Sequence, residues 1–458
     1  MPTDDTIAAI ATPAGSGGIG IIRISGPEAE NILLRLFQPS HPLVIFQPRR
    51  LYHGDLVCPE TGRALDEVLI TLMKGPHSFS GEDTLEIFCH GGILILESVL
   101  SSVLKAGARL AEPGEFTRRA FLHDRIDLTQ AEAIGDMISA RTSRGLETAV
   151  SQLKGKLKGK IDVLREKLID ILARLETEID FSEDVASQSS SEVSSQLQSL
   201  SEDLAALLRS YEQGKIDRHG ASVVIAGKPN TGKSSLLNVL LEEERAIVTP
   251  IPGTTRDFIE EAVNIRGMSI RLTDTAGIHP TEDIIEQKGI QKVWEKLADA
   301  DGVILLFDGS RPLTDEDRGI LTRLADCRVL PVINKTDLDH RLEEEEISDA
   351  LQGTTPIWIS AKFGEGIPVL KEEISRLVME RAGIQDGEIV ISSLRQKMAL
   401  ERTLQFVDQT LAGLREGLSP EFAALDIRDA LEALGEIGGE TATEQILDRI
   451  FTTFCIGK

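Results

Sequence analysis

Eight residues that begin at Gly227 have the types and the spacing to hold the phosphates of a nucleotide. Their sequence, Gly-Lys-Pro-Asn-Thr-Gly-Lys-Ser, satisfies the pattern G-x-x-x-x-G-K-[ST], in which backbone N–H groups and a helix N-terminus surround phosphate oxygens. The pattern assigns Lys233 to the β- and γ-phosphates and the Ser234 hydroxyl to Mg²⁺. We therefore expect nucleotide contacts from Asn230, Thr231, Gly232, Lys233, Ser234 and Ser235.

Two segments downstream have the composition of switch loops that close over the γ-phosphate. Asp274-Thr275-Ala276-Gly277 follows a predicted strand, so its aspartate would hold Mg²⁺ through water and its glycine N–H would contact the γ-phosphate. Upstream, Gly253-Thr254-Thr255-Arg256-Asp257 supplies the threonine that closes over the metal, most simply Thr255. The predicted contacts here are Thr249, Pro250, Ile251, Pro252, Gly253, Thr254, Thr255, Asp274, Thr275, Ala276 and Gly277.

A further motif selects the base. Asn334-Lys335-Thr336-Asp337 follows the apolar run 329–333, and a carboxylate at Asp337 can accept hydrogen bonds from guanine N1–H and the exocyclic amine together. Adenine lacks this pair of donors, so the motif favours guanine. Ser360-Ala361-Lys362 completes the predicted base pocket. Because these motifs occur in the order of a guanine-nucleotide switch, they indicate a GTPase.

The position that orients the attacking water in Ras-type switches carries an apolar side chain here. Those switches have a glutamine directly after D-x-x-G, whereas this chain has Ile278. Catalysis therefore needs another carboxylate or amide, together with a positive charge at the transition state. The side-chain carbonyl of Asn230 could bind K⁺ in the place of an arginine finger, and the alternative is that Asn230 is a plain loop residue.

The elements around these motifs predict an α/β domain set into a helical bundle. Residues 221 to about 380 alternate buried strands and helices, as in a doubly wound sheet. Apolar residues from Leu153 to Ile179 recur at steps of four and three and predict an amphipathic helix. Residues 393–415 and 421–454 are also predicted to be helical. Neither helical piece can easily bury its apolar stripe alone, so we predict one bundle built from both, with a coiled-coil dimer as the alternative.

Three local signals accompany the first helical piece. Thr129-Gln130-Ala131-Glu132 is a capping-box sequence that predicts the start of a helix. The serine-rich stretch 187–195 predicts a loop. The alternating lysines in 154–160 form the densest basic cluster, which either contacts RNA phosphates or is a solvated helix face.

The first 120 residues predict an α+β domain. Strands are expected within 6–12, 19–24, 51–57, 68–73 and 84–90, and helices over 29–37 and 93–105. Residues 15–20 also satisfy the dinucleotide fingerprint G-x-G-x-x-G. That fingerprint requires a helix at its third glycine, and Gly20 instead begins a strand-like run, so we favour a glycine-rich turn.

Composition excludes several classes of protein. The chain has 458 residues and a formal charge of −25, which predicts about three domains and disfavours non-specific nucleic-acid binding. Its four cysteines form no C-x-x-C pattern, which argues against disulfides or a zinc site and for a reducing compartment. No apolar run is long enough for a membrane span, and the N-terminus lacks the charge of a signal peptide. We therefore expect a soluble cytoplasmic protein.

From end to end, the chain resembles the bacterial TrmE (MnmE) family of tRNA-modification GTPases. Beside the nucleotide motifs, the resemblance rests on residues 5–7, 17–23, 113–116 and 127–134, and on the ending Phe-Cys-Ile-Gly-Lys at 454–458. The nucleotide motifs are shared by many GTPases, whereas the Cys-x-Gly-Lys ending is specific. Small departures are Pro250 and Pro252, which stiffen the switch, and Thr336 where alanine is common.

The resemblance implies a division of the chain and a reaction. It implies an α+β domain over 1–120 that forms a homodimer and binds 5-formyltetrahydrofolate, a helical domain over 121–217 and 383–458, and an inserted Ras-like α/β P-loop GTPase domain over 218–382. It implies GTP hydrolysis that needs Mg²⁺ and K⁺ and pairing of two G domains. With an FAD-containing MnmG-type partner, in a heterotetramer, the family adds an aminomethyl or carboxymethylaminomethyl group to C5 of the wobble uridine, U34, of certain tRNAs.

The resemblance also implies roles for individual residues. The K⁺ ligands would be Asn230, Thr249, Ile251 and Thr254, and the Mg²⁺ ligands Ser234 and Thr255. Glu286 would orient the attacking water, and the folate contacts would be Arg23, Glu86, Arg125 and Lys458. Cys455 would take part in the modification chemistry or be a buried structural thiol. The competing function is a regulatory assembly switch, for instance on ribosomes, that performs no covalent RNA chemistry.

Overall fold

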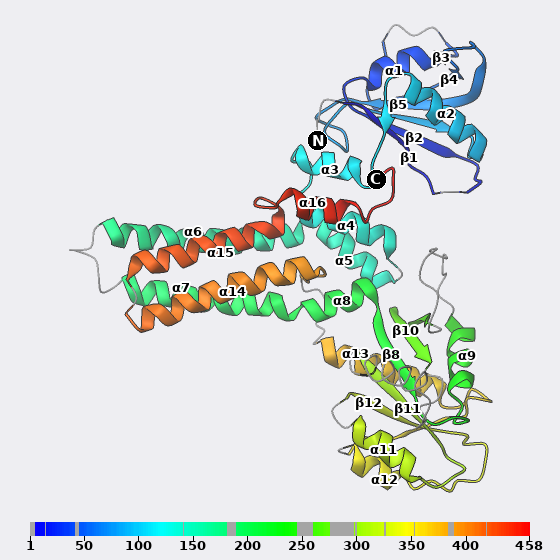
Figure 1. Cartoon of the computed structure of the whole chain (residues 1–458), viewed down its shortest axis with the longest axis vertical. Helices are drawn as coiled ribbons and strands as arrows, with labels where there is room; N and C mark the ends of the chain where they lie inside the picture. The colour runs from blue at the N-terminus through cyan, green and yellow to red at the C-terminus, as the bar shows by residue number, and fades with distance from the viewer. Residues whose placement is uncertain are drawn as a thin grey trace, which may run out of the picture. The chain divides into compact units, whose positions relative to one another are not determined.

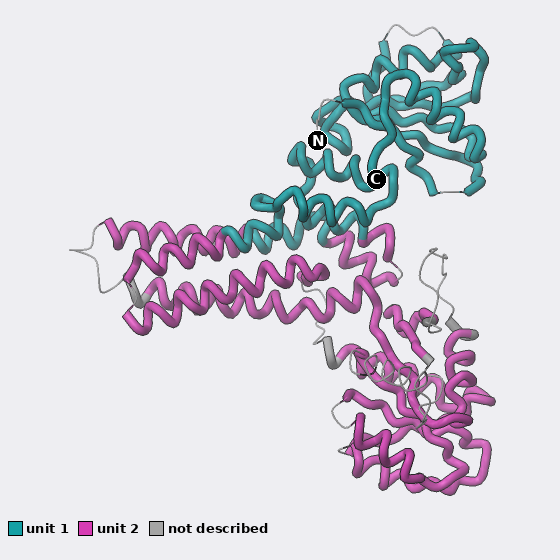
Figure 2. Tube along the Cα trace, viewed as in Figure 1, with its two compact units in different colours: residues 1–135, 152–161, 432–458 teal, residues 136–151, 162–431 magenta. Residues whose placement is uncertain are grey.

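The computed structural model describes residues 5–13, 15–41, 45–140, 142–180, 189–244, 260–274, 297, 300–324, 327–351, 353–382, 389–417 and 419–458. The chain forms two compact units (Figure 2), residues 1–135, 152–161 and 432–458 in the first and residues 136–151 and 162–431 in the second. Among the described residues, no helix combines the length and the apolar character that a bilayer crossing demands.

A seven-stranded sheet is the centre of the first unit. Its order is β3-β4-β5-β6-β2-β1-β7, and all neighbours are antiparallel except β1 and β7. The strands are β1 (Ile7–Ile10), β2 (Gly20–Ser25), β3 (Phe37–Pro39), β4 (Leu51–Val57), β5 (Ala64–Met73), β6 (Thr84–Cys89) and β7 (Arg109–Leu110). Helices α1 (Ala29–Leu36) and α2 (Ile93–Lys105) pack on it (Figure 1) and close its apolar core. The predicted α+β character is confirmed.

The glycine-rich segment 15–20 ends in a strand rather than a helix. Gly20 is the first residue of β2 and pairs with Cys89 of β6. A Cβ on Gly20 would lie 2.5 Å from the side chain of Leu96 on α2, so glycine lets the helix and the strand approach each other without a shift of that side chain. The preference for a turn over a dinucleotide fingerprint is therefore confirmed.

Three helices complete the first unit: α3 (Glu115–Leu122), α4 (Leu128–Ser139) as far as residue 135, and α16 (Glu444–Phe451). Leu447 and Phe451 of α16 form an apolar cluster with Leu128 and Ala131 of α4. The predicted capping box is wrong by two residues, because Asp127 caps α4. Its Oδ1 accepts from the backbone N–H of Gln130 at 2.8 Å, and the Gln130 side chain accepts from Asp127 N at 3.0 Å.

A buried ion cluster fixes α3. Arg119, whose side chain is 4 % exposed, contacts Asp5 at 2.6 Å and both Glu82 and Glu115 at 3.0 Å. Burial alone would raise the pKa of the Glu115 carboxyl, but hydrogen bonds from Arg109, the Glu112 N–H and Arg119 hold that pKa below its ordinary value. Removing one partner would leave a buried charge uncompensated, so the cluster sets where α3 lies.

Helices from both ends of the chain form one bundle in the second unit. Its members are α5 (Ser143–Leu153) as far as residue 151, α6 (Lys156–Asp180) from residue 162, α7 (Ser189–Arg209), α8 (Tyr211–His219), α14 (Leu394–Arg415) and α15 (Pro420–Gly438) as far as residue 431. Figure 1 shows α6 beside α15 and α7 beside α14, and ion pairs or hydrogen bonds join them, Glu176 to Arg428 at 2.7 Å and Ser201 to Asp408 at 2.7 Å. The predicted split bundle is confirmed.

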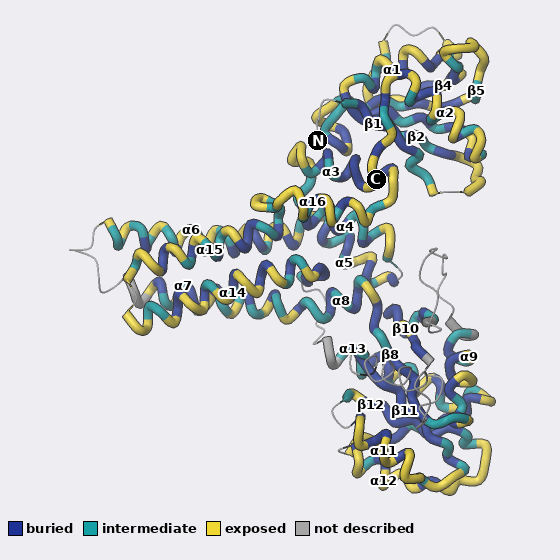
Figure 3. Tube along the Cα trace, viewed as in Figure 1, coloured by how far each residue is buried: buried dark blue, intermediate teal, exposed yellow. Residues whose placement is uncertain are grey.

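The apolar seam predicted for α6 is buried along the helix, from Leu157 to Leu175 (Figure 3). The serine-rich loop prediction is wrong for residues 189–195, which belong to α7. Serine is only slightly unfavourable in a helix. The buried residues Val193, Leu197, Leu200 and Leu204, packed in the bundle, therefore decide its conformation.

The α/β part of the second unit is a six-stranded sheet in the order β13-β12-β11-β8-β10-β9. All neighbours are parallel except β9 and β10. The strands are β8 (Ala221–Ala226), β9 (Glu260–Ile265), β10 (Met268–Asp274), β11 (Gly302–Asp308), β12 (Val329–Asn334) and β13 (Ile357–Trp358), and the helices are α9 (Lys233–Glu244), α11 (Asp315–Arg323), α12 (Glu344–Ala350) and α13 (Ile367–Ala382). The predicted doubly wound sheet is confirmed, apart from its antiparallel edge.

Two helical glycines give a matched test of the packing. A Cβ on Gly214 of α8 would lie 2.0 Å from the carbonyl oxygen of Ile391, whereas a Cβ on Gly319 of α11 would meet nothing within 4 Å. We expect Gly214→Ala to destabilise the protein by about 1–3 kcal/mol through overpacking. We expect Gly319→Ala to stabilise it by about 0.5–1 kcal/mol. Scanning calorimetry measures both, and shifts of the same sign would contradict the close approach of α8 to residue 391.

Candidate nucleotide-binding site

The predicted phosphate loop connects a buried strand to a helix, as its pattern requires. It follows β8 and leads into α9. Gly227 has φ +142°, and a Cβ there would lie 2.5 Å from the carbonyl oxygen of Leu306. Gly232 has φ +103°, and a Cβ there would lie 2.2 Å from the Nδ2 of Asn334. Both positions therefore demand glycine, for backbone conformation and for space.

The loop curves around its own lysine. Lys233 is buried, and its Nζ donates to the carbonyl oxygens of Gly227 at 3.0 Å and Lys228 at 2.8 Å. The Thr231 hydroxyl donates to the same Lys228 carbonyl at 2.8 Å. Ser234 and Ser235 are exposed in the first turn of α9, and a helix N-terminus favours an anion. This arrangement can bind phosphates between the lysine and the helix N-terminus.

One buried amide joins the phosphate loop to the base motifs. The Asn334 side chain, at the end of β12, donates through Nδ2 to the carbonyl of Thr231 at 2.8 Å. Its Oδ1 accepts from the backbone N–H of Ala361 at 2.9 Å. Asn334 is 3 % exposed. The structure thus brings together three motifs, of which the phosphate loop lies 103 positions before the base motif and the third lies 27 positions after it.

The carboxylate that is predicted to read guanine is held by one neighbour and is otherwise open to solvent. Asp337 is exposed, and its Oδ1 accepts a hydrogen bond from the Ser360 hydroxyl at 2.8 Å. Ser360 is fully buried, so its hydroxyl holds the Asp337 carboxylate from the protein interior. Lys362 is exposed, and its Nζ lies 4.9 Å from the centre of the Phe363 ring. A carboxylate held at one oxygen retains acceptor capacity for two donors of a base.

Sequence reasoning missed Asp308, at the end of β11. Its Oδ2 accepts from the Nζ of Lys335 at 2.6 Å, and Ser310 donates to its Oδ1 at 2.6 Å. Burial raises the pKa of the Asp308 carboxyl, but these hydrogen bonds outweigh burial and hold that pKa below its ordinary value. Lys335 has φ +70°, so the ion pair helps to hold a strained lysine at the base motif. The signal that could have found it is a carboxylate at the carboxyl end of a buried strand.

Sequence reasoning also missed an ion pair that holds Lys228 of the phosphate loop. The Nζ of Lys228 lies 2.8 Å from the Oδ2 of Asp317 and 2.6 Å from the hydroxyl of Thr314. Thr314 and Asp317 also form the capping box of α11. Lys228 therefore ties the loop to the start of this helix, a contact across 86 positions in sequence that local patterns do not reveal.

Part of the predicted site lies outside the described residues. This part comprises the switch segment 249–257, residues 275–277 and Glu286. Asp274 is the last residue of β10, as predicted, and its side chain lies outside the described set. Within the described ranges, no three His, Cys, Asp or Glu side chains gather as a metal cluster. A serine hydroxyl in the first turn of α9, next to bound phosphates, nevertheless suits Mg²⁺, which is usually held by few protein ligands.

The predicted folate residues lie in the first unit, and three of them are linked through the C-terminal tail. Arg23 donates through Nε to Glu86 at 2.9 Å and through a terminal nitrogen to the carbonyl of Gly457 at 3.3 Å. The carbonyl of Lys458 accepts from the Phe116 N–H at 3.1 Å. Arg125 donates to the carbonyl of Ser78 at 3.1 Å. Among the described residues, Arg125 forms no hydrogen bond or ion pair with the other three.

Cys455 is not a buried structural thiol. Its side chain is exposed, and its carbonyl oxygen accepts from the N–H of Gly114 at 3.4 Å and of Lys458 at 3.3 Å. Gly457, at φ +97°, packs so closely that a Cβ would lie 2.3 Å from the carbonyl oxygen of Ile10. The tail is therefore fixed through its backbone, which leaves the thiol accessible.

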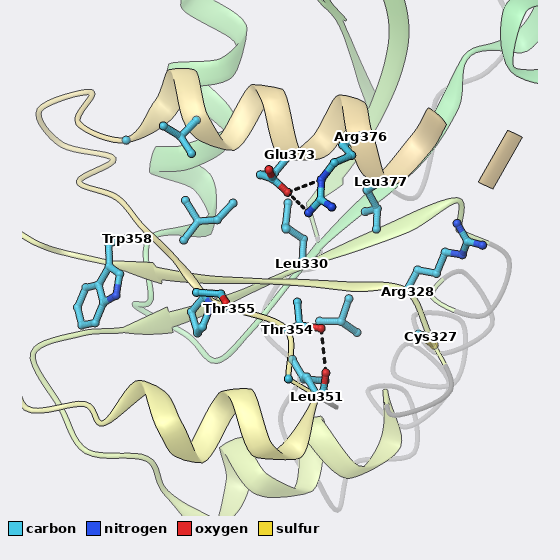
Figure 4. Close-up of a pocket in the computed structure, with 16 residues that line it drawn as sticks. Cys327, Arg328, Leu330, Leu351, Thr354, Thr355, Trp358, Glu373, Arg376 and Leu377 are labelled. Carbon is cyan, nitrogen blue, oxygen red and sulfur yellow. Dashed lines mark hydrogen bonds and ion pairs between the residues drawn. The ribbon is translucent and has the colours of Figure 1, made fainter. Parts of the chain in front are cut away.

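A hollow in the α/β part is separate from the nucleotide motifs. It measures about 950 Å³ and lies between α13 and the first residues of β12, beside Arg328, Leu330 and Leu377 (Figure 4). The base motif lies at the other end of β12, about 17 Å along a strand of six residues. In such sheets ligands bind at the carboxyl ends of the strands. The predicted nucleotide motifs lie at these strand ends, whereas the hollow does not.

Comparison with known proteins agrees with the geometry. The family model described as GTP-binding protein TrmE N-terminus matches residues 6–125, and the MnmE helical domain model matches residues 128–455. The chain is 70 % identical over 454 residues to the tRNA modification GTPase MnmE of Syntrophus aciditrophicus (strain SB), with 99 % of both chains covered. It is 47 % identical over 460 residues to that of Geobacter sulfurreducens, with 100 % of both covered.

Among solved structures, the G domain of the T. maritima FeoB iron transporter is 27 % identical, with 35 % of this chain and 98 % of that chain covered and a TM-score of 0.28. The two family models together span nearly the whole chain, and the curated relatives match over their full length. The chain therefore belongs to the MnmE family of tRNA modification GTPases.

Proposed function

We propose that this protein binds and hydrolyses GTP as the GTPase subunit of a tRNA-modifying complex. The observation that carries the proposal is the Asn334 amide, because it holds the phosphate loop and the base motif in one site. Family membership supports tRNA as the molecule that is modified. The reaction adds an aminomethyl or carboxymethylaminomethyl group to C5 of U34, together with an FAD-containing MnmG-type partner.

Recognition of guanine falls to Asp337. The carboxylate, with one oxygen held by Ser360, accepts from guanine N1–H and N2–H₂, and the Lys335 and Lys362 side chains border the base. Lys233 and the N-terminus of α9 bind the β- and γ-phosphates. Ser234 and Thr255 provide the protein ligands for Mg²⁺, which neutralises the phosphate oxygens when it is bound.

Hydrolysis depends on a cation and on a carboxylate from the switch region. Asn230 has φ +63° and is exposed in the phosphate loop, a position that suits a side-chain carbonyl which binds K⁺, with Thr249, Ile251 and Thr254 as its further ligands. A K⁺ ion held by these residues would supply positive charge beside the transferring phosphoryl group. Glu286 orients the attacking water, in the role that Ile278 cannot perform. Pairing of two G domains in a homodimer orders the loops over the nucleotide.

The first unit binds 5-formyltetrahydrofolate. Arg23, Arg125 and Lys458 supply positive charge for its carboxylates, and Glu86 accepts from the pterin amine. The exposed Cys455 beside this tail takes part in the modification chemistry. We also propose that the working domains are residues 1–120, 121–217 with 383–458, and 218–382, and that the protein acts in the cytoplasm.

The base contact is tested by Asp337→Asn. An amide cannot accept from both guanine donors, and each lost charge-assisted hydrogen bond costs about 1.5–3 kcal/mol, or about 10- to 150-fold in affinity. We expect weaker binding of GTP and improved binding of xanthosine triphosphate, measured by fluorescence titration. Asp339→Asn, two exposed positions away, is the control and should change neither affinity. Unchanged GTP affinity for Asp337→Asn would remove this carboxylate from the base pocket.

The cation is tested by comparing salts. We expect hydrolysis in KCl to exceed that in NaCl by more than about tenfold, since electrostatic stabilisation of this kind contributes roughly 10²–10⁴-fold and several carbonyl oxygens fit K⁺ better than Na⁺. Asn230→Ala should erase the difference, and Asn31→Ala, on α1 in the first unit, should retain it. Glu286→Ala should lose rate while it still binds GTP. Equal rates in both salts at matched ionic strength would exclude the cation mechanism.

A further inference from the structure

Helix α8 connects the bundle to the nucleotide-binding sheet within the second unit. It follows Ser210 and ends at Gly220, immediately before β8, whose other end leads into the phosphate loop. Ile216 of α8 belongs to the apolar core of the sheet, together with Ile270 and Leu272 of β10. A Cβ on Gly220 would lie 2.5 Å from the carbonyl oxygen of Ser269. Movement of β8 or β10 therefore has to move α8.

The two residues that follow Ile216 in α8 have opposite charges. Asp217 accepts from Arg144 of α5 at 3.1 Å, and Arg218 contacts Asp136 of α4 at 2.6 Å. Both carboxylates are buried, with 3 % and 9 % of their side chains exposed. Burial raises the pKa of Asp217, against the opposing effect of Arg144. These two crossed ion pairs, which we call the α8 clamp, join α8 to residues 136–151.

The surroundings of the α8 clamp leave little room for slippage. A Cβ on Gly145 would lie 2.4 Å from the carbonyl oxygen of Asp217, and the Thr148 hydroxyl lies 3.3 Å from its carboxylate. A cavity of about 10 Å³ lies among Asp136, Asp217 and Ser392, which is at most the room for one water molecule. At the start of α8, the Ser210 hydroxyl accepts a hydrogen bond from the backbone N–H of Ile391 at 3.2 Å.

A buried ion pair seldom adds more stability than well-packed apolar residues in the same place. Separating the two partners is nevertheless costly, because it leaves a buried charge unpaired. In one pair α8 supplies the carboxylate, and in the other it supplies the guanidinium. Because the two residues of α8 are adjacent, the pairs together oppose both rotation and sliding of the helix. We propose that Asp217 and Arg218 are positioning residues that make residues 136–151 follow α8, so that the nucleotide state of the phosphate loop and β10 reaches α4 and α5. The inference rests on the proposed GTP binding.

Amide hydrogen exchange of the full-length protein tests this coupling. Exchange is measured by mass spectrometry with saturating GDP and with saturating non-hydrolysable GTP analogue. In the wild type we expect protection of α5, over residues 143–153, to differ between the two states by about 5- to 150-fold, the range of typical couplings. In Asp217→Asn we expect that difference to fall below about twofold, while the effect of nucleotide on α9 persists.

Two further variants separate coupling from simple loss of structure. Arg144→Met/Asp217→Asn removes both members of the pair, leaves no buried charge of that pair unmatched, and should behave as Asp217→Asn does. Asp203→Asn breaks an ion pair with Lys167 between α7 and α6 and should retain the wild-type difference. A purely structural role would lower α5 protection equally in both nucleotide states and keep their ratio.

The proposal is overturned if wild-type α5 protection is the same with both nucleotides while α9 responds, or if the double variant keeps the wild-type ratio. Failure of the proposed function has a different signature. In that case neither nucleotide changes the protection of residues 227–241, and the coupling inference falls with it.

Discussion

The nucleotide site depends on the placement of one buried amide, that of Asn334. A buried amide must satisfy its donors and acceptors within the protein, since an unpaired one costs about 1–3 kcal/mol. Asn334 does so by bonding to backbone groups of Thr231 and Ala361. Three loops at the carboxyl ends of parallel strands therefore have one mutual arrangement. Gly232 takes part because any side chain there would displace the amide.

Ion pairs fix the residues around this amide in position. Lys335 forms an ion pair with Asp308 at the end of β11, and Lys228 forms one with Asp317 in the first turn of α11. Each pair fixes one side of the site by charge rather than by apolar packing, which leaves the exposed faces of Lys362 and Asp337 for the base. In the first unit, the C-terminal tail is likewise held through backbone contacts while the Cys455 side chain is free of the core.

The sequence predicted best the features that local spacing encodes. The phosphate loop, the strands around it and the α6 seam have patterns that extend over one turn or one strand, and the structure has them where they were expected. The start of α4 was misplaced because Thr129 and Asp127 both have capping side chains, and only the structure shows that Asp127 bonds to Gln130. Asp308, Asp317 and the α8 clamp were missed for another reason. Their partners lie 27 to 89 positions away, or in separate elements, and one sequence carries no record of such pairs.

The central claim is that GTP, read by this site, drives modification of tRNA. The most direct measurement is nucleoside analysis of tRNA incubated with the protein, the proposed flavoprotein partner, the proposed folate and one nucleoside triphosphate. The account predicts that wild-type protein modifies wobble uridine with GTP, and that Asp337→Asn does so with xanthosine triphosphate but not with GTP. Modification by Asp337→Asn that proceeds equally with GTP, or with no triphosphate, would contradict it.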